Sequence, residues 1–170
     1  MATLWLLRHA KAETFGRGGP DDKARALTRR GRKQASGLGS WVASKPKALE
    51  GCESPELILC SSSRRTQETL AGFLGASGLR PRVEILDALY EADPEALHYL
   101  LTGYPMVSSI LVVGHQPTMG LFREDLLKTK HRSERPTRTC SLAVLGFPAD
   151  VISEIVPGTG KLRAMVDRFA

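Results

Sequence analysis

Charged and imidazole side chains follow three of the apolar runs in this 170-residue chain. They are Arg8 and His9 after 3–7, Arg64 and Arg65 after 56–60, and His115 after 108–114. A guanidinium fork matches the oxygens of a phosphate group two at a time, and a neutral imidazole nitrogen can attack phosphorus. These residue types therefore indicate chemistry on a phosphoryl group, with His9 as the candidate nucleophile.

The segments that must position these side chains alternate between strand-like and helix-like patterns. We expect strands at 3–7, 56–60, 83–86, 108–114, 141–147 and 161–166. We expect helices from the N-cap Thr28 to about Lys45, from the turn 61–65 to about Ala76, over 94–101, and from Pro117 to about Leu127. This alternation predicts a single α/β domain over residues 1–170 with a mostly parallel sheet. The late strands lack long helices between them, which leaves room for an antiparallel part.

The three turns should meet in one cleft, because parallel α/β sheets bind ligands outside the carboxyl ends of their strands. Several cations in one cleft repel each other, and a bound dianion such as phosphate would relieve that repulsion. His9 would form a phosphohistidine intermediate that water hydrolyses, while arginines and a protonated His115 hold the charge on the transferred oxygens. Since these cations would do the work of a metal ion, we expect neither a metal nor a cofactor.

The net charge of +6 arises from basic residues that are concentrated in two segments. The first basic segment comprises Arg17, Lys23, Arg25, Arg29, Arg30, Arg32 and Lys33, and the second comprises Lys128, Lys130, His131, Arg132, Arg135 and Arg138. A positive field attracts phosphorylated substrates, acidic proteins and nucleic acids. Asp21 and Asp22 interrupt the first segment, and neither segment is interleaved with aromatic residues, so the pattern does not favour nucleic acid as a partner.

Apolar runs and cysteines bear on where the protein works. No apolar run approaches the roughly 18–20 residues that a membrane span needs, and the N-terminal residues lack a signal-peptide pattern. We therefore expect no membrane partner and a cytoplasmic location, and the oligomeric state stays open. The three cysteines, Cys52, Cys60 and Cys140, form no CxxC pair, so we expect buried or incidental thiols rather than disulfides or a zinc site.

Four segments of the chain resemble motifs of one known family. LLRHAKAE (6–13) is similar to the RHG/RHA signature of the histidine phosphatase superfamily, which includes the cofactor-dependent phosphoglycerate mutases. CSSSRRTQETL (60–70) and LVVGHQP (111–117) are similar to its second and third motifs, and RALTRRGRKQA (25–35) resembles the short bacterial phosphohistidine phosphatases of the SixA type. The resemblance covers nearly the whole chain, and the motifs are specific in combination.

This resemblance implies a fold and a set of site residues. The family fold is a three-layer α/β/α sandwich of the phosphoglycerate mutase-like type. By position, His9 is the nucleophile, and the phosphate pocket consists of Arg8, His9, Arg65 and His115. The register of the second motif selects Arg65 over Arg64, and Thr66 stands where the family usually has alanine.

A general acid is the least defined of the expected roles. Family members that cleave esters supply a carboxylic acid to protonate the leaving oxygen, and Glu91 lies in the corresponding part of the chain, with Asp93 as a weaker candidate. An alkoxide needs this proton, whereas an imidazole leaving from phosphohistidine, with a pKa of about 6.5, needs less help. A site without a dedicated acid would therefore suit a phosphorylated protein histidine, and an ordinary loop position for Glu91 stays open.

Two kinds of phosphorylated substrate remain. The short chain leaves little room for insertions that would close the pocket around a small molecule, which favours phosphohistidine on a signalling protein. The alternative is a small-molecule phosphomonoesterase or phosphoanhydride hydrolase on the same scaffold, with Glu91 as the acid. A mutase must shield its phosphoenzyme from water, and the chain has little material for a lid.

Other classes of protein fit less well. A tyrosine-phosphatase-like enzyme using Cys60 would need five residues between the cysteine and an arginine, and Arg64 and Arg65 both come too early. A protein that binds phosphate or nucleic acid without turnover is the remote alternative. Pure binding does not require a nucleophile, so the presence of both His9 and His115 argues against it.

Overall fold

Six strands form one sheet in the computed structural model, which describes residues 1–14, 21–127 and 137–169. Within these ranges the strands are β1 (Ala2–Arg8), β2 (Leu57–Ser61), β3 (Arg82–Leu86), β4 (Ser109–Gly114), β5 (Leu142–Phe147) and β6 (Lys161–Val166). The α-helices are α1 (Arg29–Ala43), α2 (Arg64–Ser77), α3 (Pro94–Thr102) and α4 (Thr118–Leu127). Short 3₁₀ helices lie at η1 (Asp22–Ala24), η2 (Lys47–Leu49), η3 (Asp87–Leu89) and η4 (Ile152–Glu154).

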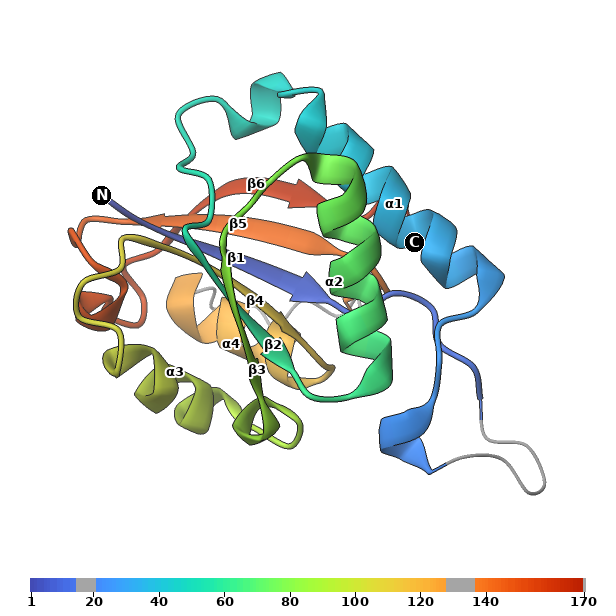
Figure 1. The fold of residues 1–170 in the computed structure, drawn as a ribbon. Helices are drawn as coiled ribbons and strands as arrows, with labels where there is room; N and C mark the ends of the chain where they lie inside the picture. Colours follow the sequence, from blue (N-terminus) through green and yellow to red (C-terminus); the bar gives the residue numbers. More distant parts are fainter. Residues whose placement is uncertain (15–20, 128–136, 170) are drawn as a thin grey trace.

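The sheet is mostly parallel, as the sequence predicts. The strand order is β3-β2-β4-β1-β5-β6, and the pairs within β3-β2-β4-β1 are parallel (Figure 1). β5 runs antiparallel to β1, and β6 runs antiparallel to β5. The late strands therefore supply the antiparallel part of the sheet, because they follow one another without a crossover helix.

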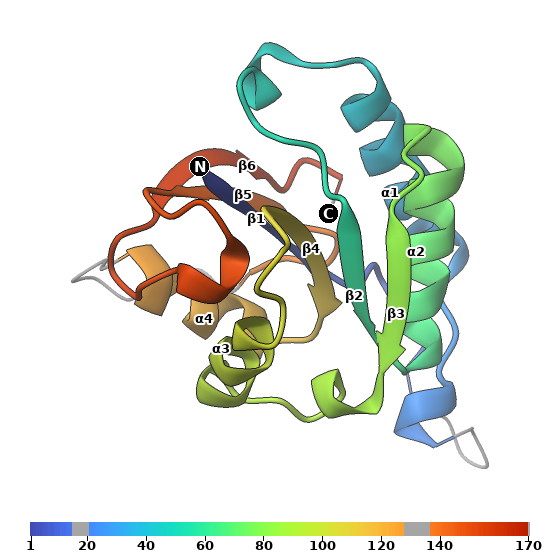
Figure 2. The ribbon, with the colours of Figure 1, turned by 60° about the vertical axis from the view of Figure 1, so that its left-hand side comes forward.

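Helices cover both faces of the sheet. α1 and α2 lie on one face, and α3 and α4 lie on the other (Figures 1 and 2). Side chains alternate along each strand, so Leu7 packs in the core under α1 and α2 while Leu6 packs under α3 and α4. The expected three-layer α/β/α sandwich of the phosphoglycerate mutase-like type is confirmed.

Helix α1 begins where the sequence predicts and depends on close packing. The Thr28 hydroxyl accepts a hydrogen bond from the Gly31 amide at 3.0 Å, which caps the helix. A Cβ on Gly31 would lie 2.0 Å from the carbonyl oxygen of Lys11, and one on Gly39 would lie 2.4 Å from that of Phe73. These two glycines weaken the helix locally. Gly31 allows the helix to approach the loop after β1 closely, and Gly39 allows it to approach α2 closely.

Two helix starts differ from the expectation. The expected turn 61–65 is shorter, because Ser63 caps α2 and places Arg64 and Arg65 in its first turn. Helix α4 begins at Thr118 rather than at Pro117. None of the helices in the described residues combines the length and hydrophobicity that crossing a membrane requires.

The two basic segments are described only in part. Arg17 and most of the second segment lie outside the described residues, and Arg138 is the member of the second segment within them. In the first segment, Lys23 forms an ion pair with Asp87 at 2.8 Å, and Arg25 pairs with Asp22 at 2.9 Å. These two cations are therefore partly neutralised.

Candidate active site

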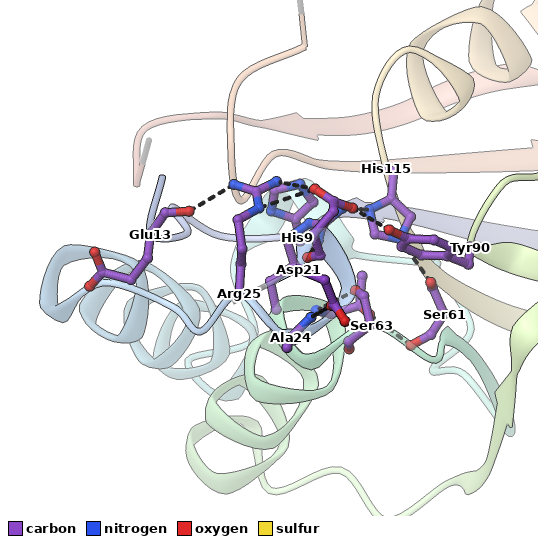
Figure 3. Close-up of polar contacts among 12 residues, drawn as sticks. His9, Glu13, Asp21, Ala24, Arg25, Ser61, Ser63, Tyr90 and His115 are labelled. Atoms are coloured by element: carbon purple, nitrogen blue, oxygen red, sulfur yellow. Dashed lines mark hydrogen bonds and ion pairs between the residues drawn. The ribbon is translucent and has the colours of Figure 1, made fainter. Parts of the chain in front are cut away.

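The carboxyl ends of three parallel strands bring both candidate histidines together. β4 pairs with both β1 and β2, so the turns that follow these strands lie on the same edge of the sheet. The His9 amide donates to the Gly114 carbonyl at 3.0 Å, and the ring centroids of His9 and His115 are 5.4 Å apart. Figure 3 shows the two imidazoles converging from their separate strands.

His9 is buried and has one ring nitrogen without a proton. Its side chain is 9% exposed, and Nδ1 lies 2.8 Å from the carbonyl oxygen of Ala10. A carbonyl can only accept, so Nδ1 donates, and in the neutral ring Nε2 keeps its lone pair. Burial, followed by the charges of His115, Arg65 and Arg8, lowers the pKa of His9 to about 3. The ring is therefore neutral near pH 7, as a nucleophile must be.

Backbone contacts hold this nucleophile against α2. The Ala10 amide donates to the Thr69 hydroxyl at 2.9 Å, and the same hydroxyl donates to the Arg65 carbonyl at 2.7 Å. Thr69 thus joins the His9 turn to the helix that carries Arg65. Thr66, which stands in place of the family's usual alanine, donates to the Ser61 carbonyl at 2.7 Å and closes the turn before the helix.

Arg65 points into the site, and Arg64 points away from it. Arg65 is 6% exposed; Nη1 donates to the Asp22 carbonyl at 2.7 Å, and Nη2 lies 3.1 Å from Asp22 Oδ2 and 3.2 Å from His115 Nδ1. Arg64 is exposed and pairs with Glu68 one turn along α2. The structure therefore places Arg65, the arginine that the motif register selects, beside the two histidines.

His115 is held by a hydroxyl on one side and a guanidinium on the other. An arginine can only donate, so Nδ1 of His115 accepts from Arg65, and Nε2 carries the proton and donates to the Ser61 hydroxyl at 2.7 Å. Burial and then the charge of Arg65 lower the pKa of His115 to about 4. Burial and the nearby cations therefore keep the ring neutral in this arrangement, and a protonated His115 beside a transferred phosphoryl group stays a prediction.

Arg8 completes the cationic wall of the site. It is half-buried, and Nη1 donates to the Thr137 carbonyl. The Nε groups of Arg8 and Arg65 are buried and have no hydrogen-bond partner among the described residues. Buried donors without partners are unfavourable, so these two Nε groups are a local cost of holding both guanidinium groups in the site.

Asp22 and Tyr90 join the site although the sequence reading did not select them. Asp22 Oδ2 accepts from the Tyr90 hydroxyl and from Arg65, while Oδ1 accepts from Arg25 Nε at 3.1 Å and Nη2 at 2.9 Å. The Tyr90 hydrogen bond, followed by those from the arginines, lowers the pKa of Asp22 to about 2. Figure 3 shows Arg25 and Tyr90 reaching toward the same point beside His115. The sequence offered only the acidic character of Asp22 within a basic segment.

The two candidate acids have different surroundings. Asp93 caps α3, and its Oδ1 accepts from the Ala96 amide at 2.7 Å, which gives this carboxylate a structural role. Glu91 is exposed and directly follows Tyr90 in the chain. Its role as an acid stays a prediction.

The two buried cysteines do not offer a second nucleophile. All three are free, and burial raises the pKa of both Cys60 and Cys140 to about 12. A thiol with such a pKa is not a thiolate near neutral pH, so a Cys60-based mechanism does not fit. Among the residues described, no group of three or more His, Cys, Asp or Glu side chains could hold a metal ion.

The buried neutral state of His9 has a consequence for stability. Its pKa is about 3 in the folded chain against the ordinary histidine value of 6.5, so below pH 6.5 the unfolded chain binds a proton that the folded chain excludes. The free energy of unfolding should therefore fall as the pH drops from 6.5 toward 3. Urea unfolding should show that His9→Asn loses about 1–2 kcal/mol less than the wild type on going from about pH 7 to about pH 5. Equal losses would contradict the buried neutral imidazole.

Comparison with known proteins identifies relatives in sequence. The model of the histidine phosphatase superfamily (branch 1) matches residues 4–102. The chain is 34% identical over 117 residues to the uncharacterized protein ML1117 of Mycobacterium leprae, and the match covers 66% of each, just under two thirds of the relative.

Solved structures show the same fold over almost the full chain. The candidate phosphohistidine phosphatase SixA of Agrobacterium tumefaciens is 25% identical, with a TM-score of 0.80 and coverage of 98% of this chain and 97% of that one. Its counterpart from Nakamurella multipartitia is also 25% identical, with a TM-score of 0.77 and coverage of 98% and 95%. Each is similar in fold from end to end.

Proposed function

The chain belongs to the histidine phosphatase superfamily, and on that premise we propose that it is a metal-independent phosphohistidine phosphatase with His9 as its nucleophile. The family match and the SixA neighbours support a phosphatase. The observation that carries the proposal is the buried, neutral His9, which keeps a free Nε2 beside His115 and the Arg65 that contacts it.

The proposed reaction has two displacements at phosphorus. The Nε2 lone pair forms a bond to phosphorus, while the bond to the leaving atom breaks and its electron pair departs with that atom. Water then attacks the phosphoenzyme, releasing inorganic phosphate and returning the electron pair to Nε2. Arg8 and Arg65 hold the transferred oxygens, and the phosphate dianion raises the pKa of His115, so that this ring can donate to an oxygen as well.

We propose phosphohistidine as the substrate because its imidazole leaving group has only a modest need for a general acid. Asp22, the carboxylate nearest the phosphate ligands, has a pKa of about 2 and so holds no proton to give near neutral pH. An imidazole with a pKa of about 6.5 leaves without a strong acid, unlike an alkoxide. The charges of the arginines replace those of a metal ion in this scheme.

A phosphorylated protein is the proposed partner. A groove of about 650 Å³ is lined by neighbours in the chain of Asp22 and Arg65. The lining residues are Asp21, Lys23, Ala24, Ser62, Arg64, Gln67, Glu68 and Ala71. None of the phosphate ligands lines this groove, so we place in it only polypeptide that flanks the phosphorylated side chain. The free thiols suit the reducing, cytoplasmic compartment in which we place the reaction.

Two substrates with different leaving groups test the proposal. We expect kcat/KM for a phosphohistidine-carrying protein to exceed that for an alkyl phosphate by about 100-fold or more, because a missing general acid penalises the alkoxide. Glu91→Gln should change phosphohistidine hydrolysis less than about twofold, since a leaving imidazole needs little help from a general acid. A preference for the alkyl ester that Glu91→Gln removes would instead establish a small-molecule phosphomonoesterase with Glu91 as its acid.

A further inference from the structure

Asp22 places a carboxylate among the phosphate ligands, where an anionic substrate must also bind. We propose that Asp22 is a specificity-determining residue that disfavours substrates with a second negative charge beside the phosphoryl group and favours a leaving imidazole that carries a proton. This inference rests on the proposed function and deepens it, because it assigns the charge of the preferred substrate to one residue.

The position of Asp22 is at the mouth of the site. Its side chain is 39% exposed, whereas that of Arg65, to which it binds, is 7% exposed. The aromatic ring of Tyr90, which donates to Asp22, lies edge-on to His115 with the centroids 5.6 Å apart. A group attached to a phosphoryl bound by Arg65 and His115 would leave the pocket past this carboxylate.

Several contacts keep the carboxylate there. The Asp22 carbonyl accepts from Arg65 Nη1, so the main chain as well as the side chain is tied to the phosphate ligand. Arg25 holds Oδ1 through two nitrogens, and Asp21 caps η1 through the Ala24 amide at 2.9 Å. A substrate therefore meets a fixed negative charge rather than one that can swing away.

A fixed charge at this place selects between substrates. Two like charges several ångströms apart near a protein surface repel enough to change an equilibrium roughly tenfold. A small phosphorylated metabolite with a carboxylate or a second phosphate would be repelled by the Asp22 carboxylate. A protein phosphohistidine brings no such second anion on its ring.

The same charge assists the departure of imidazole. Phosphoimidazole is protonated by the buffered solvent on the ring nitrogen that does not carry phosphorus, and Asp22 stabilises that cationic ring. Nε2 of His9 then forms its bond to phosphorus while the old phosphorus–nitrogen bond breaks. That bond's electron pair returns to the ring, which leaves as neutral imidazole. No other reactant is required.

Asp22 also contacts Arg65, so a purely positioning role must be separated from charge selection. A positioning role would slow all substrates by the same factor, whereas charge selection changes the ratio between substrates. The ratio of kcat/KM for p-nitrophenyl phosphate to that for 3-carboxy-4-nitrophenyl phosphate isolates the second effect. The two esters differ by one carboxylate placed away from phosphorus.

Three variants complete the test. The wild type should prefer the uncharged ester by roughly tenfold, and Asp22→Asn should reduce this preference to about twofold or less. Asp22→Glu keeps the charge and should keep most of the preference. Asp150→Asn changes an exposed carboxylate next to Ala149, whose carbonyl accepts from the Ala2 amide at the start of β1, the sheet edge opposite His9, and should keep the full preference.

The outcomes separate this inference from the proposed function. If Asp22→Asn hydrolyses both esters more slowly but with the wild-type ratio, Asp22 only positions Arg65 and the inference is wrong. If the wild type shows no turnover that depends on His9, the proposed function fails and the inference fails with it. Should Asp22→Asn be too slow for kinetics, calorimetric dissociation constants for phenylphosphonate and 3-carboxyphenylphosphonate supply the same ratio.

Discussion

His9→Ala should lower kcat/KM for both p-nitrophenyl phosphate and a phosphohistidine protein by about 10⁴-fold or more, since loss of a nucleophile removes the covalent route. Both substrates are affected because the same Nε2 attacks phosphorus whatever the leaving group. The loss should appear in kcat, measured by initial rates over a range of substrate concentrations. The arginines and His115 remain, so phosphate should still bind.

Two controls show that this loss is chemical and not structural. The circular dichroism of His9→Ala should stay close to that of the wild type, and the melting temperature should fall by only a few degrees, since a single buried ring is removed. His98→Ala removes a histidine on α3, in the helical layer across the sheet from α2, and should keep wild-type rates. An active His9→Ala variant with the wild-type fold would contradict the assignment of the nucleophile.

Arg65→Ala should lower kcat/KM for p-nitrophenyl phosphate by about 10³-fold or more, because a guanidinium that holds the transferred oxygens stabilises the transition state. Arg65 is buried between Asp22 and His115, so its loss also leaves the Asp22 carboxylate and the His115 Nδ1 with one donor fewer. Initial-rate measurements at saturating and limiting substrate should show losses in both kcat and kcat/KM.

The adjacent arginine supplies a matched control. Arg64 is exposed and pairs with Glu68, an ion pair that contributes little at a surface. Arg64→Ala should therefore stay within about twofold of the wild type on the same ester. It is a matched control because it removes the same kind of side chain from the same helical turn as Arg65→Ala. Similar losses for Arg64→Ala and Arg65→Ala would contradict the separation of the two side chains in the structure.

The layers of the fold could be predicted because they follow from local patterns. Apolar runs such as 108–114 identify buried strands, and the capping hydroxyl of Thr28 identifies the start of α1. The start of α2 was misplaced because 61–65 contains three serines, each of which could cap a helix. The packing around Ser63 decides between them, and that packing involves Thr66 in the first turn of the helix.

The residues that would bind phosphate could be predicted from the sequence, but the contacts that support them could not. His9 and His115 end strands, and the motif register selects Arg65, so these residues are visible in the sequence. Asp22 is 43 residues from Arg65 and 68 from Tyr90, and no periodic pattern links positions so far apart. The charge state of His115 also depended on this assembly, because it is set by burial and by Arg65 rather than by the motif.

The most direct test of the central claim is to identify the residue that carries phosphorus during turnover. The wild type is mixed with a phosphohistidine protein, quenched in base within milliseconds and analysed by peptide mass spectrometry. We predict a phosphoryl group on His9 that acid removes and base does not. Turnover at wild-type rates with the phosphoryl group on another residue of the enzyme, or with none on His9, would contradict the account.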